Sequence, residues 1–340
     1  MKALVWTGEK SLEVQEKAMP AHKGKVLIRV SYAGICGSDI SVYLGKHPRA
    51  KAPLVLGHEF SGVIEEIGEG VKTDLEPGTP VVVIPTYYCG HCHACLSGNT
   101  HVCSSLRLFG TDSDGGMAEY AAVPEENVFA LPKDMPLDVA AAVEPVAVVV
   151  HALRMVKNKF YSSACVTGLG PMGLLTALML KDTGVSNLLA VEANENRAEY
   201  GRKLGLKVVN PLKDNVAAAV AEMTGGEGVD LLVEASGNAQ VAATVTDLTA
   251  VRGEILLLSV FKEPAAIDLR AINFKEQNMI GTRVYTKLDF KDAITYTYYN
   301  EEKIRQVISH VHKLSEGPDV FAEMTSGHTN TMKVLFDCKA

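Results

Sequence analysis

The sequence predicts an α/β protein with two domains, one rich in short β-strands and one built around a doubly wound parallel sheet. Its 340 residues correspond to roughly two domains at about 150 residues each. Up to about residue 135, short apolar segments alternate with Gly and Pro, which is typical of a β-barrel or sandwich with long loops. After about residue 147, continuous apolar runs are separated by helix-length segments. Strands buried on both faces are apolar throughout, so this second pattern indicates a parallel sheet covered by helices.

The strands of the first half are predicted from three segments: residues 26–30, 63–64 and 81–84. Apolar side chains alternate in the first, and Gly-containing turns flank the other two. In the second half, six apolar runs fit the strands of a nucleotide-binding sheet: residues 165–167, 188–191, 208–209, 229–233, 255–258 and 279–280. Residues 290–314 have apolar side chains at near-helical spacing and are predicted to be helical. Residues 333–336 form a last predicted strand, which could return the chain to the first domain.

Composition excludes several classes of function. Hydrophobic residues make up 47% of the chain and charged residues 21%, as in an ordinary globular protein. The net charge of -7, from 33 basic and 40 acidic residues, disfavours nucleic acid and anionic lipid as partners. The first ten residues lack the core of a signal peptide, and the apolar stretch 139–150 is too short to cross a bilayer. We therefore expect a cytoplasmic protein that binds small molecules and no membrane.

A glycine fingerprint opens the second half. The run Gly168-Leu169-Gly170-Pro171-Met172-Gly173 lies between a predicted strand and an apolar helix. In this context the first glycine makes a tight turn, the second lets the backbone approach a pyrophosphate, and the third allows close packing of helix and strand. The sequence therefore predicts a dinucleotide site.

Two residues bear on whether the dinucleotide is NAD or NADP. Glu192 lies nineteen residues after Gly173, at the end of the next predicted strand, where a carboxylate accepts hydrogen bonds from the adenosine ribose. Because a 2'-phosphate would meet like charge there, NAD is favoured over NADP. Arg197 lies nearby and leaves a phosphate-binding alternative open.

Four of the seven cysteines are close together in the sequence. Cys89, Cys92, Cys95 and Cys103 form a C-x2-C-x2-C-x7-C run, which matches a closed structural zinc site. The ferredoxin alternative ends in C-x3-C-P, whereas here seven residues intervene and Ser104 follows Cys103. An odd cysteine count in a reducing compartment disfavours disulfides.

A second metal constellation is dispersed along the chain. It consists of Cys36-Gly37-Ser38-Asp39, Gly57-His58-Glu59 and Glu144-Pro145. Cysteine, histidine and carboxylate with one open position are the ligands of a catalytic zinc. A loop histidine and a small buried cysteine that bind no metal would produce the same sequence pattern. Spacing alone leaves both interpretations open.

The order of these motifs, with Asp114 to Tyr120 (D-G-G-M-A-E-Y) between the cysteine run and Glu144, resembles the zinc-dependent medium-chain alcohol dehydrogenases over nearly the whole chain. Glu144-Pro145 is similar to the sorbitol-type polyol and butanediol dehydrogenases. The cysteine run and its Thr100-His101-Val102-Cys103 ending are also similar to threonine dehydrogenases, which commonly have Asp where this chain has Glu144.

The resemblance implies a GroES-like β-barrel catalytic domain over residues 1–147 and 286–340 and a Rossmann domain over residues 148–285. By position, Cys36, His58 and Glu144 would be ligands of a catalytic zinc, and Glu59 a fourth ligand or one held off by metal-bound water. Asp39 would orient His58. A tetramer or dimer is expected by the same analogy.

The reaction that the resemblance implies is oxidation of a secondary alcohol or polyol by NAD to a ketone. Ser38 would carry the hydroxyl proton away, although Ser41 stands where many relatives have the histidine that ends this relay. His47, a short loop away, could substitute, and an exposed loop histidine with no role is the alternative. Tyr285 could reach the substrate cleft, but a packing role between domains is the preferred interpretation. Oxidation of L-threonine or another hydroxy amino acid is the alternative. A non-catalytic or zinc-free relative is disfavoured because Cys36, His58 and Glu144 are all present.

Overall fold

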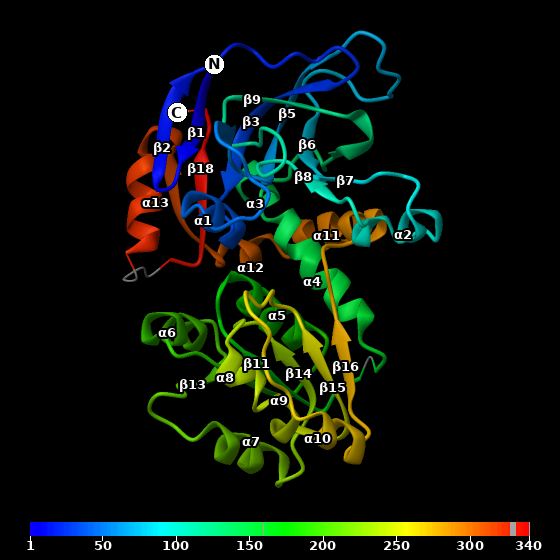
Figure 1. Cartoon of the computed structure of the whole chain (residues 1–340), viewed down its shortest axis with the longest axis vertical. Helices are drawn as coiled ribbons and strands as arrows, with labels where there is room; N and C mark the ends of the chain where they lie inside the picture. Colours follow the sequence, from blue (N-terminus) through cyan, green and yellow to red (C-terminus); the bar gives the residue numbers. More distant parts are fainter. Residues whose placement is uncertain (159, 327–330, 340) are drawn as a thin grey trace. The chain divides into compact units, whose positions relative to one another are not determined.

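The computed structural model describes residues 1–158, 160–326 and 331–339, and the chain divides into two compact units (Figure 1). Unit 1 contains residues 1–148 and 284–340, and unit 2 contains residues 149–283. The boundary between the first part of unit 1 and unit 2 falls within helix α4 (Val143–Met155). No helix among the described residues is both long and apolar enough to cross a membrane.

Unit 1 is built mainly of antiparallel strands. Its N-terminal part contains β1 (Lys2–Gly8), β2 (Ser11–Glu16), β3 (Val26–Gly34), α1 (Gly37–Tyr43), β4 (Leu54–Val55), β5 (Glu59–Ile67), β6 (Pro80–Val83), β7 (Thr86–Tyr87), α2 (His93–Leu96), β8 (Arg107–Leu108), β9 (Tyr120–Val123), β10 (Val128–Ala130) and α3 (Leu137–Ala140). Its C-terminal part contains α11 (Lys287–Tyr299), α12 (Glu301–Arg305), β17 (Ile308–Lys313), α13 (Gly317–Thr325) and β18 (Lys333–Asp337). Among the described residues, the largest sheet has seven strands, with the path β10-β6-β5-β3-β18-β17 and β9 paired to β3.

The core of unit 1 forms where these strands turn apolar side chains to one side. Ile28, Val30, Phe60 and Phe336 come from three adjacent strands of the large sheet and are all buried in one cluster. At roughly 1.5–3 kcal/mol for each fully buried aliphatic or aromatic side chain, this cluster holds the loops between the strands in place. Those loops carry the candidate metal ligands.

The predicted C-terminal helix is only partly correct. Helices α11 and α12 cover its first part, but Ile308–Lys313 form strand β17, which pairs in parallel with β18. Val307, Ile308 and Val311 fit a helical period by coincidence, and pairing with the neighbouring strand decides the outcome. The predicted strand at residues 333–336 forms as β18 and pairs with β3, so it completes the sheet of unit 1.

Unit 2 is the predicted doubly wound sheet. It contains β11 (Ser163–Thr167), α5 (Pro171–Asp182), β12 (Asn187–Val191), α6 (Glu195–Lys203), β13 (Lys207–Val209), α7 (Val216–Thr224), β14 (Val229–Glu234), α8 (Ala239–Ala242), α9 (Val245–Leu248), β15 (Thr249–Leu257), α10 (Leu269–Phe274) and β16 (Asn278–Gly281). In the part of the chain that the structure describes, six parallel strands have the order β13-β12-β11-β14-β15-β16. This order places the reversal beside β11, where a doubly wound sheet binds a dinucleotide.

Candidate metal centres and cofactor site

Two loops of unit 1 bring the first candidate metal ligands together. Cys36 follows β3 and precedes α1, while His58 and Glu59 begin β5, which pairs with β3. One ligand atom from each of these three residues lies within 4.8 Å of the other two. Gly34 faces Glu59 across the strand pair, and a Cβ at Gly34 would lie only 2.3 Å from the Glu59 carboxylate. A glycine at this position therefore leaves room for the carboxylate.

Asp39 fixes the relative position of the two loops. Its carboxylate accepts hydrogen bonds from the backbone N–H groups of Cys36 (2.8 Å) and Gly57 (3.2 Å). Its Oδ1 lies 3.7 Å from Nδ1 of His58, which is too long for a hydrogen bond but close enough for charge attraction. Asp39 therefore acts on His58 through both the backbone and the local field.

His58 has the surroundings of a metal ligand. It is buried, and Nδ1 has no hydrogen-bond partner within the described residues. Burial alone would lower its pKa, but the nearby Asp39 carboxylate and the Cys36 sulfur outweigh burial and raise the pKa well above its usual value. A cation at this place is therefore favoured, and a divalent metal between a thiolate, an imidazole and a carboxylate supplies one.

Glu59 is also paired with a lysine that the sequence analysis missed. Lys333, the first residue of β18, places Nζ 2.7 Å from both carboxylate oxygens of Glu59 and 3.2 Å from the Ile35 carbonyl. Both side chains are almost completely buried. The available signal was a lysine at the start of the apolar run Val334-Leu335-Phe336. Buried ion pairs need such additional hydrogen bonds to offset the loss of water.

Glu144 lies outside the group formed by Cys36, His58 and Glu59. It belongs to the first turn of α4, and its Oε1 accepts a hydrogen bond of 2.8 Å from the hydroxyl of Tyr285. Burial raises the pKa of Glu144 to about 7, and the positive charge of His58 opposes this rise. The second carboxylate of the dispersed constellation is therefore held by a tyrosine, whereas the first is held by a lysine.

Ser38 and His47 differ in whether their side chains reach the candidate metal ligands. The hydroxyl of Ser38 lies 3.5 Å from Nε2 of His58, at the limit of hydrogen bonding. His47 instead uses Nδ1 to accept hydrogen bonds from the backbone N–H groups of Arg49 and Ala50, so its ring stabilises its own loop. Ser38 is therefore the hydroxyl that reaches the candidate ligands.

The four cysteines of the run form a second, more regular cluster. Their Sγ–Sγ distances are 3.5 Å (Cys92–Cys95), 3.5 Å (Cys89–Cys103), 3.8 Å (Cys92–Cys103) and 4.0 Å (Cys89–Cys95). A tetrahedron with Zn–S bonds of about 2.3 Å has S–S edges of about 3.8 Å, whereas a disulfide bond measures about 2.05 Å. The separations therefore fit a bound tetrahedral metal and exclude disulfides among these four residues.

The local backbone prepares these sulfurs to carry charge. The N–H groups of Cys92 and Cys89 point at the sulfurs of Cys89 and Cys103, each at 3.4 Å. Hydrogen bonding from the backbone of Cys95 lowers the pKa of the Cys92 thiol to about 5, and hydrogen bonding from the backbone of Cys89 lowers that of Cys103, whereas burial raises the pKa of Cys95 to about 12. Because zinc binds thiolate and not thiol, this environment favours metal binding.

The glycine loop of unit 2 has the form that a dinucleotide requires. Gly168 has φ +89°, and a Cβ on Gly173 would lie 1.8 Å from the Gly168 carbonyl oxygen, so both positions need glycine. At Gly170, a Cβ would meet only the guanidinium of Arg197, at 3.8 Å, among the described residues. The open space at Gly170 is where the pyrophosphate of a dinucleotide would approach the N-terminus of α5.

Glu192 and Arg197 both lie close to this loop. The Glu192 carboxylate follows β12 and accepts hydrogen bonds from the backbone N–H groups of Leu169 (2.6 Å) and Asn194 (2.8 Å). Arg197, on α6, has a buried Nε without a partner in the described part of the chain. An arginine beside open space at a helix N-terminus fits a phosphate group.

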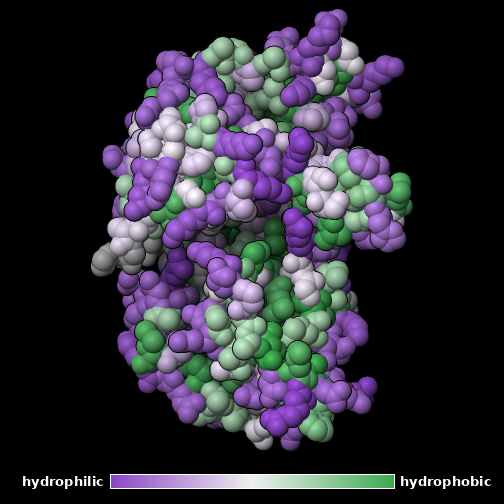
Figure 2. All heavy atoms as spheres, in the orientation of Figure 1, coloured by the Kyte–Doolittle hydropathy of each residue, from purple (hydrophilic) through white to green (hydrophobic). Residues whose placement is uncertain are grey.

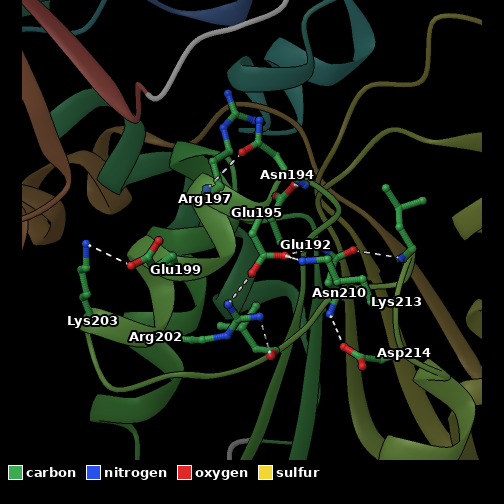
Figure 3. A network of polar contacts seen from close by, with 12 residues as sticks. Glu192, Asn194, Glu195, Arg197, Glu199, Arg202, Lys203, Asn210, Lys213 and Asp214 are labelled. Atoms are coloured by element: carbon green, nitrogen blue, oxygen red, sulfur yellow. Dashed lines mark hydrogen bonds and ion pairs between the residues drawn. The ribbon is translucent and has the colours of Figure 1, made fainter.

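Two other cations near Glu192 are already paired, as Figure 3 shows. Glu195 accepts hydrogen bonds from Arg202 (2.7 Å), Lys213 (2.7 Å) and Asn210 (2.8 Å). The pairing with Lys213 and Arg202 lowers the pKa of Glu195 to about 2. Arg202 and Lys213 are therefore both held by Glu195, although one carboxylate balances only one of their two positive charges.

Comparisons with known proteins agree with both units. Residues 22–133 match the alcohol dehydrogenase GroES-like domain, and residues 171–297 match the zinc-binding dehydrogenase family. The chain is 35% identical to 2-dehydro-3-deoxy-L-galactonate 5-dehydrogenase of Pseudoalteromonas atlantica, over 100% of this chain and 99% of that protein. It is also 35% identical to an L-threonine 3-dehydrogenase of Bacillus velezensis, over 79% of each chain.

A solved structure supports the same assignment. The crystal structure of 2R,3R-butanediol dehydrogenase from Bacillus subtilis has a TM-score of 0.90 and 31% identity to this chain, with 99% of both chains covered. The fold class predicted from the sequence, a GroES-like barrel domain with a Rossmann domain, is confirmed. This chain belongs to the zinc-type medium-chain alcohol dehydrogenase family.

Proposed function

We propose that the enzyme oxidises a secondary alcohol or polyol to a ketone, with NAD as the hydride acceptor and a zinc ion at the Cys36 centre. The observation that carries the proposal is the convergence of Cys36, His58 and Glu59 within 4.8 Å. Thiolate, imidazole and carboxylate are ligands of catalytic zinc sites. When bound, zinc supplies a Lewis acid that makes a substrate hydroxyl more acidic, and the nicotinamide ring accepts the hydride.

Cys36 and His58 are the permanent ligands in this proposal, and Glu59 and Glu144 share the remaining protein positions. The two carboxylates differ in how many of their oxygens are already engaged in hydrogen bonds. Lys333 engages both oxygens of Glu59, while Tyr285 engages only Oε1 of Glu144. Glu144 therefore keeps Oε2 for a metal, and Glu59 must weaken its pairing with Lys333 in order to bind.

Ser38 removes the proton of the substrate hydroxyl. Its Oγ can both donate and accept hydrogen bonds, so it can accept that proton while passing its own toward solvent. Its place 3.5 Å from the imidazole of His58 supports this role. With Ser41 at the position of the usual relay histidine, water is the remaining acceptor that the proposal requires.

NAD is the proposed cofactor because of charge at the end of β12. A 2'-phosphate would approach the Glu192 carboxylate, and Arg202 and Lys213 are both engaged by Glu195. Gly168, Gly170, Pro171, Met172 and Gly173 form the proposed pyrophosphate turn, with Arg197 beside it. The four-cysteine cluster is proposed to hold a second, structural zinc.

We also propose a cytoplasmic homo-oligomer, a dimer or a tetramer. All seven cysteines are free, which suits a reducing compartment. Strand β16 ends its sheet, and Figure 2 shows hydrophobic side chains at the surface of unit 2. Val251, Val260, Leu269 and Phe274 are all at least 64% exposed. A second copy would bury such side chains. Light scattering of the purified protein tests this state, and a monomer at micromolar concentration would contradict it.

The function itself is tested by following cofactor reduction at 340 nm with purified zinc-loaded protein. The panel contains polyols, vicinal diols, simple secondary alcohols, hydroxy acids and L-threonine, each with NAD and with NADP. We expect turnover with NAD and a much lower kcat/KM with NADP. A preference for L-threonine would favour the second candidate, which the threonine dehydrogenase relative supports. The absence of cofactor reduction with every alcohol in the panel would contradict the proposal.

A further inference from the structure

A cavity within unit 1 is lined in part by Tyr285, the residue that hydrogen-bonds to Glu144. Its volume is about 140 Å³ and it opens to solvent, and Thr86, Tyr87, Asn127, Tyr285 and Lys287 are among the residues that line it. Three tyrosine rings, two threonine hydroxyls and an amide suit a carbon chain that carries several hydroxyl groups. The cavity is large enough for a chain of a few carbons.

Tyr285 connects the cavity to the Glu144 carboxylate. It is 3% exposed, its ring packs against Phe290 at 5.5 Å, and its hydroxyl donates to Glu144 at 2.8 Å. The Tyr285 side chain thus lines the cavity, and its hydroxyl binds the candidate ligand Glu144. A substrate lying along Tyr285 would have one part near the reacting centre and its far part near Lys287.

Lys287 is the positively charged residue and Glu126 the negatively charged residue among the described residues that line the cavity, and the two side chains form no ion pair. The Nζ of Lys287 donates to the backbone carbonyl of Glu126 at 2.9 Å, which fixes its position without neutralising it. Among the described residues, no carboxylate oxygen pairs with it within 4.0 Å, in contrast to Lys213 and Lys333. No other lysine or arginine occurs among the described residues that line the cavity.

We propose that Lys287 binds the carboxylate of the substrate, so that the preferred alcohols of this enzyme are hydroxy acids rather than neutral polyols. This inference rests on the dehydrogenase function proposed above and names its substrate class. Two N–H groups of the ammonium remain available after the bond to Glu126. A single ammonium balances one carboxylate, whereas a phosphate dianion would call for a second cation.

The test compares six-carbon hydroxy acids with the neutral alcohols of the same carbon chain. D-gluconate and D-galactonate are paired with sorbitol and galactitol, and glucitol 6-phosphate serves as the phosphate probe. Lys287→Gln removes the charge but keeps a donor for the Glu126 carbonyl, and Lys287→Arg keeps the charge. Lys291→Gln, one turn further along α11 and exposed, is the matched control.

We expect the wild-type enzyme to have a higher kcat/KM for an acid than for its paired polyol. Lys287→Gln should raise KM for the acid by about tenfold relative to KM for the polyol, with kcat changed much less. Lys287→Arg should restore most of the preference, Lys291→Gln should leave it unchanged, and added salt should weaken it.

Three results would overturn this inference while leaving the dehydrogenase function intact. They are turnover of neutral alcohols alone, equal KM changes for acid and polyol in Lys287→Gln, and a larger effect of that substitution on the phosphate probe than on the acids. The absence of turnover with every alcohol would instead count against the proposed function itself.

Discussion

The two candidate metal centres of this chain differ in how their ligands are assembled. The cysteine cluster takes four ligands of one type from fifteen consecutive residues, and backbone N–H groups donate hydrogen bonds to two of the four sulfurs. The Cys36 centre takes unlike ligands from separate elements, and both candidate carboxylates already have a partner: Glu59 within the group pairs with Lys333, and Glu144 outside it binds Tyr285. The first arrangement is closed and suits a structural metal, whereas the second leaves room for exchange and suits a catalytic one.

The largest effect that would sharpen this contrast is expected for Cys36→Ser. Losing the thiolate should weaken zinc binding at the centre, so kcat/KM should fall by about a thousandfold or more, because a Lewis acid contributes several kcal/mol to the transition state. The Rossmann unit is separate, so binding of NADH, followed by its fluorescence, should persist. Turnover that stays within tenfold of wild type would refute the catalytic assignment.

The next effect is on stability. Lys333→Met leaves the buried Glu59 carboxylate without its partner, and the free energy of unfolding should fall by about 3–5 kcal/mol. The double variant Lys333→Met/Glu59→Gln removes both charges and should recover much of this loss. Urea denaturation of the three proteins measures the difference, and a single variant as stable as wild type would show that the ion pair contributes little.

Cys95→Ser should show the reverse of the Cys36→Ser pattern. Because zinc binding contributes to folding free energy, loss of one cluster ligand should lower the thermal midpoint and remove one zinc per chain. At a temperature well below that midpoint, kcat should stay within a few-fold of wild type. If kcat instead falls as far as in Cys36→Ser, the cluster is not purely structural.

The smallest effect is expected for Tyr285→Phe. This change leaves Oε1 of Glu144 buried without its donor, at a cost of about 1–3 kcal/mol. We expect kcat/KM to fall by about tenfold through the misplaced carboxylate, with little change in the zinc content. Unchanged kinetics would mean that Glu144 is positioned by packing alone.

The sequence predicted those features that depend on local pattern. All six strands of unit 2 form, because continuous apolar runs are diagnostic of a parallel sheet. Cys89, Cys92, Cys95 and Cys103 could be grouped because they lie close together along the chain. Lys333 could not be placed beside Glu59, since 274 residues separate them and only the sheet brings them together. The strand at 308–313 was mistaken for helix because pairing with β18, and not local spacing, determines it.

The most direct test of the central claim is stepwise removal of zinc with a chelator, with metal content, NAD reduction and the thermal midpoint measured on the same samples. We expect two zinc ions per chain. Loss of the more accessible ion should abolish turnover while the midpoint hardly changes, and loss of the second should lower the midpoint. Full turnover after the first ion is gone, or a single ion whose loss abolishes both properties together, would contradict a division between a catalytic and a structural centre.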